Sequence, residues 1–175
     1  MVDRTYCGES LTRRIERRID HVWGSIRLSE SQTAREWARY WEAMSQENAE
    51  VIRALYERWN RNDLLVFLEV LRPDAQFVNP PEAIEPGTRT GYRGFTAVGE
   101  TMSETFSSSS HEVLELQAAG PHVIASVIFR AEGTGSGVSV EQREFHVWTF
   151  QDDKVSRFAW FRSREDAVKA VGSLE

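Results

Sequence analysis

Apolar side chains recur at intervals of three and four residues in the first third of the chain. This spacing places them on one face of an α-helix and predicts three helices, over residues 11–26, 34–41 and 45–59. In the third, Ile52, Leu55, Tyr56 and Trp59 follow the spacing i, i+3, i+4, i+7, which is typical of a helix that buries one face. Two further apolar stretches predict helices over residues 64–71 and 95–106, the first of them stopped by Pro73.

The pattern changes from helical to extended after residue 110. Four β-rich stretches separated by turn residues predict an antiparallel meander; they are residues 112–118, 123–131, 138–150 and 154–162. We expect a short strand over 75–79, a long loop over 82–93, a polar turn at Ser107–Ser110 and a closing helical turn over 165–171.

Two of the predicted turns in the meander contain residues that favour unusual backbone conformations. Glycines at positions 133, 135 and 137 resemble a phosphate-binding loop, but a strand follows them where such a loop needs a helix N-terminus. A β-hairpin is therefore predicted there. Asp152-Asp153 predicts the next turn, because Asp tolerates the left-handed backbone region.

Composition limits the classes of partner. The chain has 175 residues, 41% of them hydrophobic, which is enough for one sizeable core. A formal charge of -6 argues against binding nucleic acid or an anionic membrane surface, so soluble small molecules are the expected partners. Cys7 is the only cysteine, which fits a reducing, cytoplasmic compartment, and no apolar run is long enough to span a membrane.

The chain divides by composition near Met44. Residues 1–43 hold eight Arg against seven acidic residues and form a predicted helical N-terminal extension. Residues 44–175 carry the remaining patterns and form the predicted main domain.

Several short motifs, in this order and spacing, resemble the SnoaL-like branch of the NTF2-like superfamily over about residues 44–172. They include Trp59-Asn60, Pro73-Asp74, Tyr92-Arg93-Gly94, His146-Val147-Trp148-Thr149-Phe150 and Arg164-Glu165-Asp166-Ala167. The resemblance implies an α+β conical barrel, in which a curved antiparallel sheet wraps around about three helices and leaves a cavity at its mouth. It also implies a homodimer formed through the sheet. Proteins of this type often start at a residue like Met44, so residues 1–43 are either an unusual extension or follow from a start codon assigned too far upstream.

The strand over 138–150 carries the candidate chemistry. Glu144, His146 and Trp148 share one face of it because side chains alternate along a strand. We expect His146 to face the cavity as a general base, with Glu144 raising its basicity or fixing its tautomer. A carboxylate–histidine pair on one strand is only a weak geometric signal, which favours the alternative of a core or interface histidine that is hydrogen-bonded to a backbone or hydroxyl group.

The cavity of such a cone is expected to be lined by aromatic ligand-binding residues: Tyr56, Trp59, Tyr92, Trp148 and Trp160. In the resemblance, polyketide cyclases place a general base on the last strand, and Trp160 falls at that position. Tryptophan cannot accept a proton, so that mechanism does not carry over by this residue. The histidines are scattered without a metal-binding spacing, and neither a metal nor a cofactor is predicted.

The sequence therefore predicts a SnoaL-like domain that binds a small, largely apolar molecule in its cavity. The alternative is an enzyme of the polyketide cyclase, ketosteroid isomerase or hydrolase type, with His146 as general base. The superfamily includes both enzymes and binding domains, so the fold alone does not decide between them.

Overall fold

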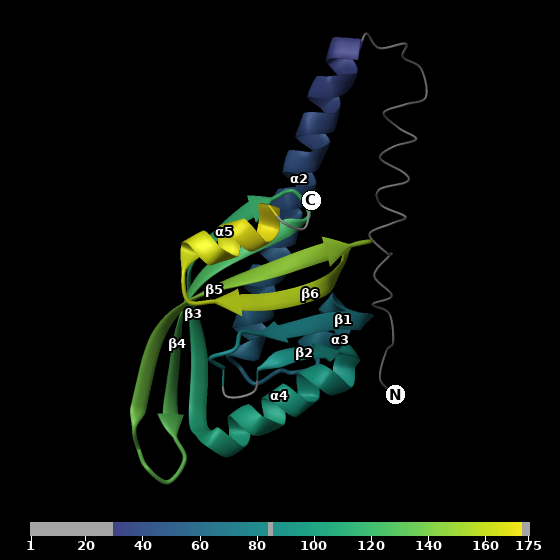
Figure 1. Cartoon of the computed structure of the whole chain (residues 1–175). Coiled ribbons are helices and arrows are strands. Elements are labelled where there is room, and N and C mark those ends of the chain that lie inside the picture. Colours follow the sequence, from purple (N-terminus) through teal and green to yellow (C-terminus); the bar gives the residue numbers. More distant parts are fainter. Residues whose placement is uncertain (1–29, 84–85, 173–175) are drawn as a thin grey trace, which may run out of the picture. The chain divides into compact units, whose positions relative to one another are not determined.

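The structure, a computed structural model, describes residues 30–83 and 86–172 (Figure 1). The helix predicted over 11–26 lies outside them. The elements are α2 (Glu30–Trp59), α3 (Val66–Val70), β1 (Leu71–Asn79), β2 (Gly87–Thr90), α4 (Gly91–Thr105), β3 (Phe106–Ala119), β4 (His122–Gly133), β5 (Ser139–Gln151), β6 (Lys154–Phe161) and α5 (Arg164–Gly172). Among the described helices, none is both long and apolar enough to cross a membrane.

Helix α2 joins two helices that the sequence pattern separates. The predicted break between 41 and 45 is wrong, because this segment contains neither glycine nor proline and its Ala43, Met44 and Glu47 favour a helix. The helix ends where Asn62 takes a left-handed backbone conformation with φ of 60°. Tyr56 and Trp59 thus lie in its last turns.

Six strands form one mixed sheet in the order β2-β1-β6-β5-β4-β3. The antiparallel meander from β3 to β6 is confirmed, as is the glycine-rich hairpin between β4 and β5. Strand β1 runs parallel to β6, which makes the sheet mixed. Strand β2 lies within the segment predicted as a long loop and pairs with β1.

Strand β1 begins earlier than predicted and contains Pro73. Proline lacks the N–H that a strand ladder needs, so within a sheet it occurs at edges and bulges. The pairing of β1 with β6 shifts register between Leu71 and Gln76, on either side of Pro73. The preceding helix therefore ends at Val70, before the proline.

The serine-rich segment Ser107–Ser110 belongs to β3, so the predicted turn is wrong. Ser110 pairs with Arg130 on β4, and β3 is an edge strand of the sheet. All four serine side chains are exposed, and the Ser107 hydroxyl donates to the backbone carbonyl of Glu132 on β4. Pairing with a long neighbouring strand thus outweighs the low strand propensity of serine.

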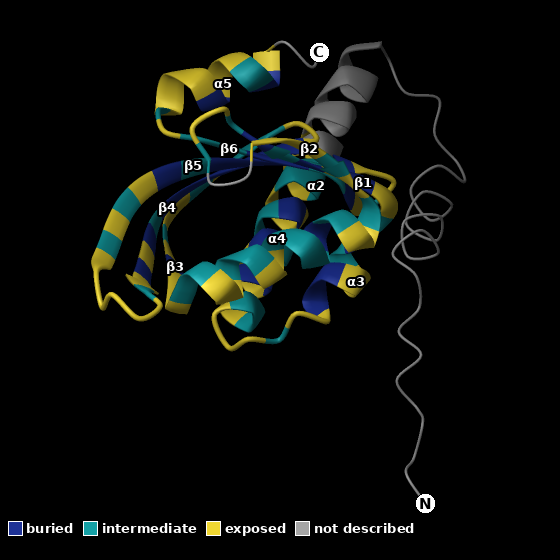
Figure 2. Ribbon diagram, turned by 60° about the horizontal axis from the view of Figure 1, so that its bottom comes forward, coloured by how far each residue is buried: buried dark blue, intermediate teal, exposed yellow. Residues whose placement is uncertain are grey.

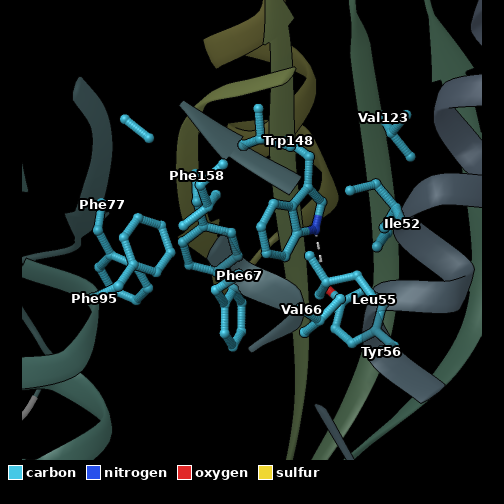
Figure 3. Packing of buried hydrophobic residues seen from close by; sticks show 14 of the residues in the cluster. Ile52, Leu55, Tyr56, Val66, Phe67, Phe77, Phe95, Val123, Trp148 and Phe158 are labelled. Carbon is cyan, nitrogen blue, oxygen red and sulfur yellow. Dashed lines mark hydrogen bonds between the residues drawn. The ribbon is translucent and has the colours of Figure 1, made fainter. Parts of the chain in front are cut away.

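The sheet is curved, and helices cover both of its faces (Figure 2). Helices α3 and α4 and the C-terminal part of α2 lie on the concave side, and α5 lies on the convex side. The main core fills the concave side with Ile52 and Leu55 of α2, Phe67 of α3, and Trp148 and Phe158 of the sheet (Figure 3).

A smaller cluster joins α5 to the convex face. Ala167 and Val171 of α5 pack against Ile124 and Val147 of the sheet. This helix covers part of the surface at which the resemblance places a second subunit. The homodimer stays a prediction.

The packing of Trp148 predicts a large effect of its removal. Its side chain has 0% exposure at the centre of the main core. We expect Trp148→Ala to lower the free energy of unfolding by about 3–5 kcal/mol, because it leaves a cavity among side chains that cannot fully collapse. Urea denaturation followed by circular dichroism measures this. The matched control, Leu65→Ala at a site with 62% exposure, should change the same quantity by less than about 0.5 kcal/mol. Similar effects of the two substitutions would contradict this account of the core.

Candidate functional site

A chain of buried hydrogen bonds joins α2 to β5 on the concave side of the sheet. The Tyr56 hydroxyl lies 2.6 Å from His146 Nδ1, and His146 Nε2 lies 2.8 Å from Glu144 Oε2. Trp148 Nε1–H donates to the Tyr56 hydroxyl at 3.1 Å (Figure 3). The strand alternation therefore places Glu144, His146 and Trp148 on one face, as expected, and Tyr56 of the facing helix connects them.

The carboxylate of Glu144 determines the tautomer of His146, because a carboxylate can only accept and Nε2 must then donate to it. Burial raises the pKa of Tyr56 well above its ordinary value, so its hydroxyl keeps its proton. The hydroxyl oxygen accepts from Trp148, and its own O–H donates to Nδ1 of His146. Nε2 then carries the imidazole proton and donates it to Glu144. Neutral His146 therefore has no free lone pair on its ring, which disfavours the predicted role of His146 as the base.

Glu144 is the more accessible member of the pair. Its side chain has 10% exposure, against 2% for His146. Its other oxygen, Oε1, accepts a hydrogen bond of 2.9 Å from Gln142 Nε2. Each carboxylate oxygen thus receives one N–H and keeps a lone pair for a further interaction.

His111 is a member of this group that the sequence analysis missed. It has 6% exposure, and its ring lies against the rings of His146, Tyr56 and Trp59. Within the part of the chain that the structure describes, neither ring nitrogen has a hydrogen-bond partner. Burial lowers the pKa of His111 to about 3, and the proximity of His146 adds to this, so the ring is neutral at physiological pH.

The side-chain amide of Asn60 positions His111. It donates to the backbone carbonyl of His111 at 2.7 Å and accepts from the backbone N–H at 2.9 Å. The amide thereby takes the place of a neighbouring strand on the open edge of β3. His111 pairs with Phe129 on β4. The predicted turn at Ser107–Ser110 left His111 outside the expected strand, so its place in the sheet was not predicted.

Three buried groups here are of types that ligate transition metals. Ligand atoms of His111, Glu144 and His146 lie within 4.8 Å of one another. His146 Nε2 and Glu144 bond each other directly, however, so His111 alone offers ring nitrogens that are not engaged. This arrangement suits a hydrogen bond from His111 to a bound molecule.

The predicted aromatic residues divide between two environments. Trp59 stacks on Tyr56 and contacts His111, and Trp148 lies beside them in the core. Trp160 pairs with His146 across the sheet but donates its indole N–H to Asn79 of β1. Tyr92 has 38% exposure at the start of α4, and among the described residues no hydrogen bond or ring contact joins it to this group.

A hollow of about 560 Å³ lies on the convex side of the sheet, between α5, β6 and the loop after β1. It does not include His146 or Glu144. The side chains of Tyr56, His111 and Phe158 pack directly around the His146 ring. A ligand cavity at His146 therefore remains a prediction.

Comparison with known proteins agrees with this fold. The SnoaL-like domain family matches residues 52–158. An NTF2-like protein of unknown function from Burkholderia pseudomallei is 21% identical with a TM-score of 0.61, covering 70% of this chain and 95% of that one. A protein described as a candidate SnoaL-like polyketide cyclase from Jannaschia sp. CCS1 is 17% identical with a TM-score of 0.60, covering 73% and 93%.

A third solved structure is a protein with a ketosteroid isomerase-like fold from Catenulispora acidiphila, in complex with trimethylamine. It is 14% identical with a TM-score of 0.58, and the match covers 70% of this chain and 92% of that one. No curated protein matches the chain. The chain belongs to the SnoaL-like domain family, and the predicted α+β fold, which it shares with solved NTF2-like proteins, is confirmed.

The hydroxyl of Tyr56 predicts a specific cost of its removal. Tyr56→Phe leaves the buried Trp148 N–H and His146 Nδ1 without this partner. We expect the free energy of unfolding to fall by about 1–3 kcal/mol, measured by urea denaturation. Tyr92→Phe removes a hydroxyl from a side chain with 38% exposure and should change this free energy by less than about 0.5 kcal/mol. Equal effects would show that the Tyr56 hydroxyl contributes nothing specific.

The buried His111 predicts a loss of stability in acid. Its pKa is about 3 in the folded protein against the ordinary value of 6.5, so between these values the unfolded chain binds more protons. This stability is fully present above pH 6.5 and decreases as the pH falls, by up to about 1.4 kcal/mol per pH unit. His111→Gln should make the free energy of unfolding vary less between pH 6.5 and 4.5, whatever its effect at pH 7. An unchanged slope would contradict the low pKa.

Proposed function

We propose that this member of the SnoaL-like domain family binds a small, largely apolar molecule on the concave side of its sheet and removes a proton from it. The observation that carries the proposal is the hydrogen-bonded chain from Tyr56 through His146 to Glu144. It supplies a carboxylate base with fixed neighbours beside a core of aliphatic and aromatic side chains.

Glu144 is the proton acceptor in this proposal. A general base needs a lone pair that points at the reacting proton, and the ring of neutral His146 has none free. The carboxylate of Glu144 retains lone pairs and is the more exposed of the two groups. The role assigned to His146 on sequence grounds therefore passes to Glu144, and His146 becomes a positioning residue.

His146 and Gln142 hold the carboxylate in place. Each donates one N–H to a different oxygen of Glu144, which limits rotation of the carboxylate. Tyr56 in turn holds His146 in the tautomer that donates to Glu144. Such preorganisation lowers the cost of aligning a base with its substrate.

His111 completes the proposed site. Its neutral ring offers one N–H donor and one acceptor nitrogen, and neither is engaged within the described part of the chain. A ligand that carries one polar group on an apolar body would satisfy this ring and pack against Trp59 and Phe129 beside it. A molecule of this kind is favoured over a highly charged one, because Glu144 is already a buried anion.

The opening of 5-nitrobenzisoxazole tests this function. In this reaction a base removes the ring C–H proton, the N–O bond breaks, and a coloured cyanophenolate forms. The probe is small, aromatic and uncharged, as the proposed site requires. We expect the protein to accelerate the reaction and Glu144→Gln to lower kcat/KM by about 10²- to 10⁴-fold.

Two further variants separate the roles. His146→Gln should lower the rate less than Glu144→Gln and change the pH profile of kcat, because His146 acts through the carboxylate. The control is Glu141→Gln, which removes an exposed carboxylate on the same strand and should leave the rate unchanged. A wild-type rate equal to that of buffer, or a Glu144→Gln rate equal to wild type, would overturn the proposal.

The second candidate function is ligand binding without turnover. It is favoured by the completeness of the hydrogen-bonded chain, which runs without a break through Trp148, Tyr56, His146, Glu144 and Gln142. A complete buried network also stabilises a fold without any catalysis. Native mass spectrometry that finds a co-purified apolar compound, together with no acceleration of the probe reaction, would favour this candidate.

A further inference from the structure

The hollow on the convex side of the sheet has the features of a second binding site. Its volume of about 560 Å³ falls within the range of about 300–1,000 Å³ that is usual for small-molecule sites. Much of its lining is apolar, from Val78, Pro80, Pro81, Ala159, Phe161 and Ala170. Because side chains alternate along β6, Arg157, Ala159 and Phe161 of this lining face away from His146, and Asn79 and Trp160 also line the hollow.

Arg157 supplies a cation to this hollow. It lies on β6, and its register neighbours are Gln76 on β1 and Thr149 on β5, neither of which carries a charge. The structure shows no hydrogen bond or ion pair to its guanidinium from the residues that it describes. Partial burial of this group lowers the pKa of Arg157, and no acid nearby opposes this effect.

The other charged residues of the hollow have partners. Arg162 lies 3.6 Å from the carboxylate of Glu82. Asp166 accepts a hydrogen bond from Ser163 at the start of α5, and Lys169 is also engaged. The hollow therefore combines an apolar lining with a guanidinium, that of Arg157, which no described acid balances.

We propose that this hollow binds an amphipathic monocarboxylate, with its carboxylate on Arg157 and its hydrocarbon part against the apolar lining. A guanidinium donates two parallel N–H bonds to a carboxylate, which fixes the orientation of the bound acid. Val78, Ala159 and Phe161 cover the surface on which an aliphatic or aromatic tail would lie.

The charge balance favours a carboxylate over a phosphate. A carboxylate carries one negative charge at neutral pH and matches the single unbalanced guanidinium. A phosphate monoester carries close to two charges and would leave one of them facing an apolar lining and the acids Glu82 and Asp166. The site thus favours a ligand that carries a single negative charge.

Calorimetric titration with octanoate tests this proposal on the full chain. We expect saturable binding to the wild type and at least about tenfold weaker binding to Arg157→Gln, because a charge-assisted pair is lost. The neutral probe octanamide should bind the wild type as weakly as octanoate binds this variant. Absence of saturable octanoate binding, or equal binding by wild type and Arg157→Gln, would overturn the proposal.

Matched controls locate the site. Arg143→Gln removes a guanidinium on the same face that bonds Ser126 and does not line the hollow, so octanoate affinity should stay unchanged. Glu144→Gln should also leave it unchanged, which separates this site from the concave one. Octanoate should shift the NMR methyl signals of Ala159 and Ala170 and not that of Ala125. Shifts at Ala125 alone would contradict the assignment even if Arg157→Gln fails to fold.

A carboxylate of a second copy of this chain is the competing occupant. In that case Arg157→Gln would turn a dimer into a monomer in sedimentation equilibrium, and the wild type would not take up octanoate. That result would replace the small-molecule proposal by a subunit interface. An unchanged oligomeric state together with weakened octanoate binding would support the proposal.

Discussion

The hydroxyl group of Tyr56 determines where the protons of the concave site lie. It receives the indole N–H of Trp148 and donates to Nδ1 of His146, which leaves Nε2 as the protonated nitrogen beside the Glu144 carboxylate. That tautomer donates to Glu144. The position of α2 over β5 therefore has a chemical consequence, since a small shift of the helix along the strand would separate the hydroxyl from both of its partners.

Burial of Glu144 makes stability and chemistry depend on the same contacts. A carboxylate with little solvent is costly unless N–H donors replace the lost water. His146 and Gln142 supply two such donors, one to each oxygen. The donors also hold the carboxylate in one orientation, so the bonds that make the buried charge tolerable are those that a proton transfer would require. Strand β5 alone supplies the carboxylate and both donors, because Gln142, Glu144 and His146 alternate onto one of its faces.

The periodicity of apolar residues predicted the helices and strands whose formation depends on residues close together in the sequence. The helical spacing up to Trp59 predicted the buried face of α2, and the alternation around His146 predicted that Glu144, His146 and Trp148 share one face of β5. The errors arose where a long-range contact overrides a local preference: the pairing of β3 with β4 makes a strand of a serine run, and a bulge accommodates Pro73 within β1. His111 was missed for the same reason, because Asn60, which positions it, is 51 residues away in the sequence.

The two candidate sites depend on one register of β6. Phe158 packs on Trp148 with ring centroids 4.4 Å apart, and Trp160 donates to Asn79, which together fix the concave face of the strand. The residues between and beside them, Arg157 among them, must then face the convex side. A slip of one residue would place this guanidinium in the aromatic core and the ring of Phe158 on the convex face. The packing of Phe158 and Trp160 that fixes the concave site around Glu144 therefore also fixes Arg157 on the convex face of the sheet.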